Sequence, residues 1–351
     1  WARSPCADAP PDGRRGAGPC PAAYGKEVGG GTVSLVEASD LLRGALLGLS
    51  KSDLVRTTIE KAPVSRDVVA RYVPGTTVAD AVQATAELRA TNRLATLDYL
   101  GEDTTERAQA EHTRDTYVAL LDALARADLS QYAAAEVSLK LSALGQYLPK
   151  DGDAIALDLA REICTAAERA GTTVTLDMED HTTTDRTLAV LHELRADFPW
   201  VGAVVQSYLK RTLGDCRDLA VAGSRVRLCK GAYKEPASVA YQDKADVDLS
   251  YVRCLKVLMA GEGHPMVASH DPRLIEIAQA LAAHHERTPE TYEFQMLYGI
   301  RPDEQKRIAD RGAQMRVYIP FGDEWYGYLM RRMAERPANT MFFVRSLLSQ
   351  G

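Results

Sequence analysis

Near its C-terminus the sequence places an aromatic residue and two arginines at helical spacing. Tyr328, Arg331 and Arg332 follow a strand-like segment, 316–322, and Glu335 comes one helical turn later. On an α-helix of 3.6 residues per turn these four side chains lie on neighbouring faces, so a ring and two fixed cations converge. Guanidinium groups bind carboxylates through two parallel hydrogen bonds, and two adjacent guanidinium groups need an anion between them. The pattern therefore predicts a site for a small carboxylate.

The same spacing also fits a solvated helix face on which Arg332 and Glu335 form an i,i+3 ion pair. Exposed pairs of this kind are common and contribute little to stability. The segment alone does not decide between the two interpretations, so the rest of the chain must be considered.

The composition favours a small-molecule ligand over a nucleic acid. The chain has 351 residues, of which 46% are hydrophobic, and a formal net charge of −6 with both signs mixed along the sequence. It lacks the basic patch of a nucleic-acid-binding protein, and it is long enough for one large domain or two ordinary ones. Six cysteines lie without C-x-x-C spacing, which is typical of reduced thiols in a cytosol.

No apolar run in the sequence has the length needed to cross a bilayer. We therefore expect a soluble, cytoplasmic protein, and we leave open a peripheral contact with the inner face of the plasma membrane.

The N-terminal quarter of the chain divides into a tail and a helical layer. Residues 1–32 are rich in Pro and Gly, show no apolar periodicity and begin with Trp1 rather than Met, so we expect a disordered or non-native tail. Residues 33–92 show four helical patterns, which we expect to form an N-terminal layer: Ala38–Leu49, Asp53–Lys61, Ser65–Tyr72 and Val78–Thr91.

From residue 93 to residue 351 short apolar runs alternate with helical patterns, which is typical of repeated βα units. Eight such runs predict a closed (β/α)8 TIM barrel, an α/β fold whose chemistry lies at the C-terminal ends of the strands. The predicted strands are Leu94–Leu100, Ala135–Leu141, Thr173–Met178, Gly202–Gln206, Arg225–Lys230, Pro265–Ser269, Thr291–Gln295 and Met315–Ile319.

Each predicted strand ends in polar or charged residues. A barrel without a ligand would also carry polar strand ends, but the density of charge here favours a binding site at the mouth. These residues are Glu102, Lys140, Asp177, Gln206, Arg227 with Lys230, His270, Gln295 and Tyr318.

Taken in order, these segments resemble the monofunctional proline dehydrogenases. The resemblance runs from residue 35 to residue 349 and implies a distorted TIM barrel whose last helix lies over the mouth. It also implies an FAD-dependent flavoprotein that oxidises L-proline to Δ1-pyrroline-5-carboxylate. The matching segments are Tyr99-Leu-Gly-Glu102, Val137-Ser-Leu-Lys140, Leu176-Asp177, Val205-Gln206-Ser-Tyr208, Val226-Arg227-Leu-Cys-Lys230-Gly-Ala-Tyr233, Ser269-His270, Tyr292-Glu-Phe-Gln295-Met-Leu297-Tyr-Gly299 and Tyr328 through Arg332.

The resemblance implies roles for individual residues. Cations are expected to bind the proline carboxylate, apolar side chains to face its ring, and Glu102 to pair with Arg331 as a gate. The implied substrate residues are Lys140, Leu297, Tyr318, Tyr328, Arg331 and Arg332; the implied catalytic residues are Lys140, Asp177 and Arg227; and the implied FAD residues are Gln206, Arg227, Lys230, Gly231, Ala232, His270, Gln295 and Glu335.

These roles agree with the chemistry. Removing a hydride from ring C5 of proline requires a neutral amine, and a cation beside flavin N5 stabilises the reduced ring, which is the implied role of Arg227. No strand–G-x-G-x-x-G–helix unit is present, so a Rossmann cofactor site is not expected. Two positions depart from bifunctional relatives, because Lys234 stands where they carry an aromatic residue and Asp271 stands where they carry asparagine. Both leave the contacts to the adenosine half of FAD less well defined.

Several residues admit a second interpretation. A strand-end lysine such as Lys140 can form a Schiff base, as in aldolases, whereas the resemblance makes it a carboxylate-binding residue paired with Asp177. The run from Asp177 to His181 superficially resembles a metal cluster, but a solvated loop is expected for Glu179–His181. Glu102 could instead be a helix N-terminal charge beside the amides of Thr104 and Thr105.

The chain has no room after Arg332 for an aldehyde dehydrogenase domain, so we expect a separate pyrroline-5-carboxylate dehydrogenase to take the product and a quinone to take the electrons. Three hypotheses remain. The first is FAD-dependent oxidation of proline, the second is a lyase or aldolase that uses Lys140 or Lys230, and the third is a barrel that binds an amino acid without turning it over.

Overall fold

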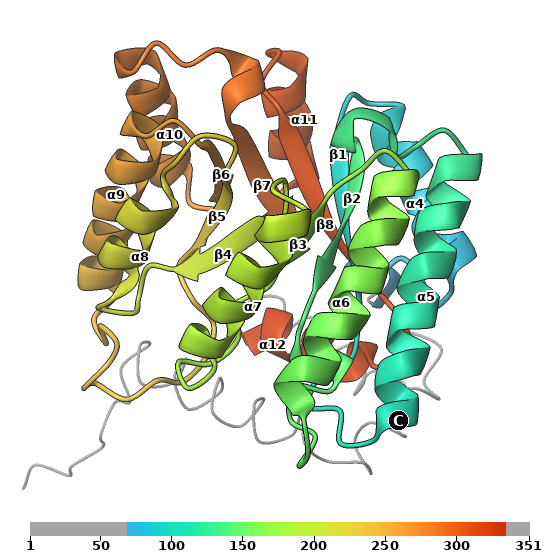
Figure 1. Cartoon of the computed structure of the whole chain (residues 1–351). Coiled ribbons are helices and arrows are strands. Elements are labelled where there is room, and N and C mark those ends of the chain that lie inside the picture. Colours follow the sequence, from blue (N-terminus) through green and yellow to red (C-terminus); the bar gives the residue numbers. More distant parts are fainter. Residues whose placement is uncertain (1–68, 335–351) are drawn as a thin grey trace, which may run out of the picture.

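The computed structural model describes residues 69–334, and these form a closed barrel of eight parallel strands in chain order (Figure 1). The predicted (β/α)8 fold is therefore confirmed. The strands are β1 (Leu94–Tyr99), β2 (Ala135–Leu139), β3 (Val174–Leu176), β4 (Gly202–Gln206), β5 (Arg225–Cys229), β6 (His264–Ala268), β7 (Glu293–Leu297) and β8 (Met315–Phe321).

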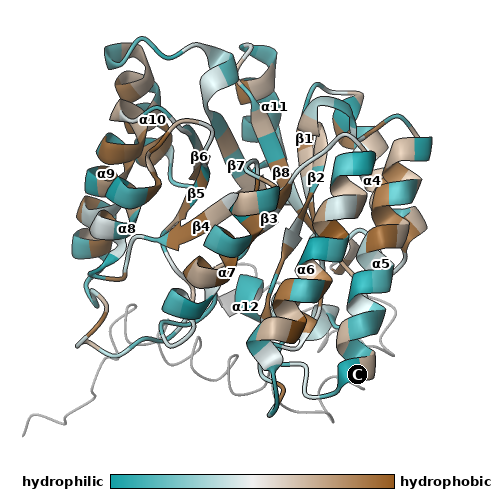
Figure 2. Cartoon of the chain, viewed as in Figure 1, coloured by the Kyte–Doolittle hydropathy of each residue, from teal (hydrophilic) through white to brown (hydrophobic). Residues whose placement is uncertain are grey.

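Helices surround the barrel and connect successive strands. Figure 2 shows them with hydrophobic residues on one face and hydrophilic residues on the other, the pattern of helices that pack on a sheet. They are α4 (Val78–Arg89), α5 (Arg107–Arg126), α6 (Gly152–Arg169), α7 (Thr184–Asp197), α8 (Thr212–Leu219), α9 (Lys244–Ala260), α10 (Pro272–His284), α11 (Pro302–Asp310) and α12 (Trp325–Ala334), with 3-10 turns η1 (Gln131–Ala133), η2 (Ser142–Leu144) and η3 (Pro289–Thr291).

Strand positions agree with the sequence prediction to within two residues at each end. The range predicted for β4, Gly202–Gln206, is the observed one, whereas the range predicted for β7 begins two residues too early. The early residues are taken by η3, which starts at Pro289, because proline favours the first position of a helical turn. Lys140 lies just beyond β2, so its side chain is carried by the following loop.

Only part of the predicted N-terminal layer is described. Helix α4 matches the predicted Val78–Thr91, and its first turn is fixed by a capping box between Thr77 and Asp80. The tail at 1–32 and the predicted helices Ala38–Leu49 and Asp53–Lys61 lie outside the described residues, as do residues 65–68 of the predicted Ser65–Tyr72 and Glu335.

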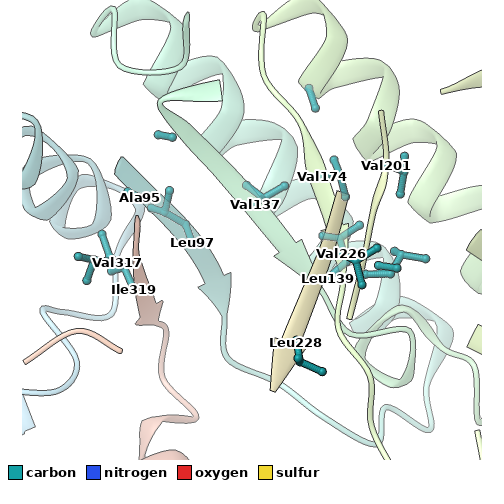
Figure 3. Packing of buried hydrophobic residues seen from close by; sticks show 14 of the residues in the cluster. Ala95, Leu97, Val137, Leu139, Val174, Val201, Val226, Leu228, Val317 and Ile319 are labelled. Carbon is teal, nitrogen blue, oxygen red and sulfur yellow. The ribbon is translucent and has the colours of Figure 1, made fainter. Parts of the chain in front are cut away.

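The hydrophobic core lies between the strands and the surrounding helices. Alternate side chains along the strands point outward, and those labelled in Figure 3 on β1, β2, β3, β5 and β8 are apolar and almost fully buried. They include Ala95, Leu97, Val137, Leu139, Val174, Val226, Leu228, Val317 and Ile319.

The inside of the barrel is charged rather than apolar. Arg225 Nη1 of β5 lies 2.6 Å from Glu136 Oε2 of β2, and these strands are not neighbours, so the pair crosses the barrel. Arg316 Nε lies 2.8 Å from Glu293 Oε1 and 3.7 Å from Glu136 Oε1. All four residues lie near the N-terminal ends of their strands, so paired charges fill this end of the barrel. The pairing is needed because an isolated buried charge is unfavourable.

Helix α12 lies at the opposite end of the barrel, below the strands in Figure 1. Its apolar residues form a second cluster with residues that follow β1 and β7, which places the helix at the C-terminal mouth as predicted. This cluster contains Tyr72, Val73, Leu100, Ile300, Tyr326, Tyr328, Leu329 and Met330.

Two further observations concern the predicted cellular environment. Within residues 69–334, no helix combines the length and the apolarity needed to cross a membrane. Cys164, Cys216, Cys229 and Cys254 are free thiols.

Candidate active site

The mouth of the barrel contains a buried ion pair between β1 and the loop after β2. Lys140 Nζ lies 2.6 Å from Asp98 Oδ2, and the side chains are 11% and 2% exposed. The predicted pairing of Lys140 with Asp177 is therefore wrong. Sequence analysis missed Asp98, although an acidic residue inside an apolar strand, in the same alternation as Thr96, is a signal that could have found it.

Asp177, which follows β3, is instead the centre of a hydrogen-bond network. Its Oδ1 accepts hydrogen bonds from Ser138 Oγ at 2.9 Å and from Arg227 Nη1 at 2.7 Å. Its Oδ2 accepts one from the Tyr318 hydroxyl at 2.6 Å. The structure thus brings together the predicted residues Asp177, Arg227 and Tyr318, with donors from three different strands.

Arg227 is held from several sides and is only 3% exposed. Its Nε donates to Gln295 Oε1 at 2.6 Å, and its guanidinium carbon lies 5.2 Å from the centre of the Tyr318 ring. Its Nη2 makes no hydrogen bond within the described part of the chain, and Glu136 Oε1 lies 3.6 Å from it. The guanidinium is therefore fixed in place, and its Nη2 group is left without a hydrogen-bond partner among the described residues.

The electrostatics of the mouth keep Lys140 charged. Burial alone would lower the pKa of Lys140, but attraction from Asp98 and then Asp177 outweighs it and raises the pKa above the ordinary value. Burial raises the pKa of Asp98, and Lys140 opposes this increase. A lysine that forms a Schiff base needs a lowered pKa, so these surroundings do not favour the aldolase interpretation.

At the rim of the mouth, Arg331 of α12 pairs with Glu102. Arg331 Nη2 lies 2.8 Å from Glu102 Oε1 and Nη1 lies 3.4 Å from Oε2, with side chains 36% and 28% exposed. The predicted contact is therefore present. The alternative role of Glu102 as a helix N-terminal charge is not supported, because α5 begins only at Arg107 and the Thr104 amide donates to Ser142 O.

Tyr328 and Arg332 of the same helix lie together. The Arg332 guanidinium carbon is 5.3 Å from the centre of the Tyr328 ring, and Tyr328 is 7% exposed. Leu297 packs against the cluster that contains Tyr328. The face that carries Tyr328 is therefore buried against the barrel, not solvated, whereas the Arg332–Glu335 pair lies outside the described residues.

The predicted FAD residues lie around the same mouth, and several have partners in the protein. Gln206 Nε2 donates to Glu179 O at 2.7 Å, and His270 Nε2 accepts from the Leu297 amide at 3.0 Å. These two side chains hold neighbouring backbone segments in place. Gln295 links Arg227 to Glu293.

Lys230 is held by two carboxylates that sequence analysis did not assign to it. Its Nζ lies 2.5 Å from Asp248 Oδ1 and 3.3 Å from Asp271 Oδ2. The next residue, Gly231, has φ +114°, and a Cβ there would lie 2.3 Å from the Tyr208 ring. Only glycine fits at this turn, and Ala232 after it is exposed.

The predicted solvated loop at Glu179–His181 is wrong. Glu179 is 5% exposed and accepts hydrogen bonds from the amide and the hydroxyl of Ser142, at 3.1 Å and 2.5 Å. Burial raises the pKa of Glu179 to about 7. His181 hydrogen-bonds to Glu235. Within residues 69–334 no three His, Cys, Asp or Glu side chains gather as a metal site.

Comparisons with known proteins agree on one family. A family model described as Proline dehydrogenase matches residues 81–345. Proline dehydrogenase 1 of Bacillus subtilis is 36% identical over 310 residues, which cover 88% of this chain and 100% of that protein. The proline dehydrogenase of Deinococcus radiodurans is 40% identical over 280 residues, which cover 79% of this chain and 89% of that protein.

A solved structure has the same fold. The proline utilization A protein (PutA) from Bdellovibrio bacteriovorus, inactivated by N-propargylglycine, superposes with a TM-score of 0.73 at 25% sequence identity. The match covers 85% of this chain and 37% of that longer protein.

Proposed function

Because the chain belongs to the proline dehydrogenase family, we propose that it oxidises L-proline to Δ1-pyrroline-5-carboxylate with FAD as cofactor and a quinone as electron acceptor. The observation that carries this proposal is the extent of the family match, residues 81–345, which includes every strand of the barrel and helix α12 over its mouth.

The mouth offers complementary groups for a small zwitterion. We assign the carboxylate of proline to Arg331 and Arg332, with Lys140 contributing its charge. The half-exposed pair of Arg331 with Glu102 supports this assignment, because the guanidinium already holds a carboxylate with both Nη atoms. We assign the apolar ring to Leu297, Tyr318 and Tyr328.

The cations also prepare the amine for oxidation. Lys140 and Arg227 are both held positively charged by the carboxylates around them. A second positive charge beside these groups is unfavourable, so they favour the neutral amine of proline over the protonated one. The neutral nitrogen has the lone pair that forms the imine as C5 is oxidised.

The residues present fit FAD. Arg227 is a buried cation held at the mouth beside Asp177 and Tyr318, and a positive charge fixed there suits the negative charge that a flavin ring gains on reduction. When bound, FAD supplies a ring that accepts a hydride from C5 of proline. We assign Arg227 to the flavin ring, and Lys230 with the backbone of Gly231 and Ala232 to the diphosphate. Gln206, His270, Gln295 and Glu335 complete the proposed cofactor set.

The proposed partners follow from the same family assignment. Electrons would pass to a membrane quinone through a peripheral contact at the inner face of the plasma membrane. The product would be taken by a separate pyrroline-5-carboxylate dehydrogenase.

The visible spectrum of the purified protein tests the proposal. Without oxygen, the flavin absorption band should bleach when L-proline is added. A flavin band that persists with L-proline would contradict the substrate and direct attention to other imino acids. A protein that shows no band even after FAD is added, and that borohydride links covalently to a substrate, would favour the lysine-based lyase.

A further inference from the structure

The loop after β5, residues 230–243, carries a buried glutamate to which the proposed reaction gives no role. Among residues 231–238 only Glu235 is buried, and its side chain is 2% exposed. Glu235 Oε1 accepts hydrogen bonds from the His181 amide at 2.9 Å and from the Tyr208 hydroxyl at 3.3 Å, and Oε2 pairs with His181 Nδ1. A carboxylate is unfavourable in a buried position unless such donors surround it, so Glu235 depends on these partners from other loops.

The two loops that meet at Glu235 are held in different ways. The loop after β3, residues 177–183, is fixed by buried hydrogen bonds of its own. Ser142 donates to the Glu179 carboxylate through its amide and its hydroxyl, and Gln206 Nε2 donates to Glu179 O. By contrast, the amides of residues 231–235 donate to no backbone carbonyl within the described part of the chain. The second loop therefore relies on side-chain contacts with the first.

We propose that Glu235 is a positioning residue whose contact with His181 holds the loop after β5 against the loop after β3. By this contact it fixes the segment 230–232 for the diphosphate of FAD. The identity of the ligand rests on the proposed function. A segment that is ordered before the ligand arrives lowers the entropy cost of binding, so the contact should increase the affinity for FAD.

Tyr208 connects this contact to the segment 230–232. Its amide donates to Lys230 O at 2.9 Å, and its ring lies against Gly231, where an added Cβ would come within 2.3 Å of the ring. Its hydroxyl donates to Glu235. One side chain thus touches both the segment and the glutamate, so a displacement of Glu235 would also disturb the packing against Gly231.

The contact between His181 and Glu235 also joins the two halves of the proposed site. The loop after β3 begins at Asp177, which binds Arg227 and Tyr318. Both loops lie at the end of the barrel where α12 is found (Figure 1). Holding them together keeps the groups assigned to the substrate and those assigned to the cofactor in one arrangement.

Limited digestion with trypsin tests the contact and needs no turnover. Lys234 is exposed and precedes Glu235, so cleavage between them should report how often this loop opens. His181→Ala removes the ring contact and leaves the cleavage sequence intact, and it should speed cleavage after Lys234 by about tenfold. The matched control is Asp153→Ala, which removes the partner of Arg186 between α6 and α7 and should leave cleavage after Lys234 unchanged.

The rate of FAD release tests the consequence for the cofactor. Followed by flavin fluorescence, release from the purified holoprotein should be about tenfold faster in His181→Ala and in Glu235→Ala. Glu235→Gln should stay close to the wild type, because its amide can accept from the His181 amide and donate to Nδ1. The double variant should release FAD no faster than Glu235→Ala, since both changes remove one contact.

Unchanged cleavage after Lys234 in folded His181→Ala would overturn the proposal. An equal rise at tryptic sites throughout the chain would also overturn it, because that result indicates a general loss of stability. Release from Glu235→Gln as fast as from Glu235→Ala would exclude a positioning role. If His181→Ala does not fold, His181→Ser is used in the same assays with the same expectation.

The two proposals fail in different ways. A wild type that takes up no FAD would contradict the proposed function, and trypsin would still decide whether the contact holds the loop. FAD that is released at one rate from the wild type and from every variant would contradict this inference alone.

Discussion

The substitution Arg331→Lys tests the proposed carboxylate site at its most specific point. In the structure, both Nη atoms of Arg331 point at the two oxygens of Glu102, at 2.8 Å and 3.4 Å. A carboxylate of proline would use the same fork. Lysine keeps the positive charge but offers one point of contact, so the change removes geometry rather than charge.

The expected magnitude follows from one lost hydrogen bond. A hydrogen bond to a charged group contributes about 1.5–3 kcal/mol. Because the Arg331 side chain is 36% exposed, water screens the interaction and we take the lower half of that range. A loss of about 1.5–2 kcal/mol corresponds to proline binding that is about 10- to 30-fold weaker.

The assay measures the KM for L-proline and the Kd of a non-oxidisable proline analogue. The flavin-to-protein absorbance ratio shows whether FAD stays bound. Arg307→Lys is the matched control, because Arg307 makes a similar two-point pair with Glu304 on α11. The control should leave the KM unchanged. An unchanged proline affinity in Arg331→Lys, with FAD in place, would refute the carboxylate role.

Three further predictions concern the network around the mouth. The pKa of Glu179 is about 7 in the folded protein and ordinarily 4.5, so stability is lost as pH rises from 4.5 to 7. Glu179→Gln should therefore gain up to about 3 kcal/mol over the wild type in urea unfolding at pH 8 and little at pH 4.5; an equal difference at both pH values would contradict this. Asp271→Asn keeps the helix cap and removes one of the two carboxylates that hold Lys230, leaving Asp248, so FAD titration should show about three- to tenfold tighter binding, and weaker binding would argue against a diphosphate there. Tyr318→Phe removes the donor to Asp177 and should lower the unfolding free energy by about 1–3 kcal/mol, whereas unchanged stability would mean that this hydrogen bond contributes nothing.

The fold could be predicted from the sequence because its signal is periodic and repeated. Apolar runs such as 202–206 are short, rich in valine and flanked by helical patterns, and eight of them permit few arrangements other than a closed barrel. The predicted positions of the strand ends were less accurate, because they depend on local turns. The strand that begins at Glu293 is one example, since η3 takes the preceding residues.

The sequence predicted which residues lie in the site better than it predicted which of them contact one another. Lys140 follows β2, and each of the two neighbouring strands supplies an aspartate, Asp98 on β1 and Asp177 just after β3, so sequence spacing does not say which one the lysine contacts. The choice depends on competition, because Asp177 is already occupied by Ser138, Arg227 and Tyr318. This competition for the Asp177 oxygens involves residues from four strands, so no local sequence pattern can reveal it.

The interior of the barrel is charged from its closed end to its mouth. Arg227 contacts Asp177 toward the mouth and lies 3.6 Å from Glu136 on the other side, while Arg225 and Arg316 also attract Glu136. Burial opposes ionisation of Glu136, but these arginines outweigh it and lower its pKa to about 2. Replacing such groups with apolar ones is often neutral or stabilising, so their presence is not explained by stability. Fixed charges in a buried interior do, however, set the potential at the mouth without rearrangement. The buried ion pairs at the closed end are therefore best understood as support for the position and charge of Arg227.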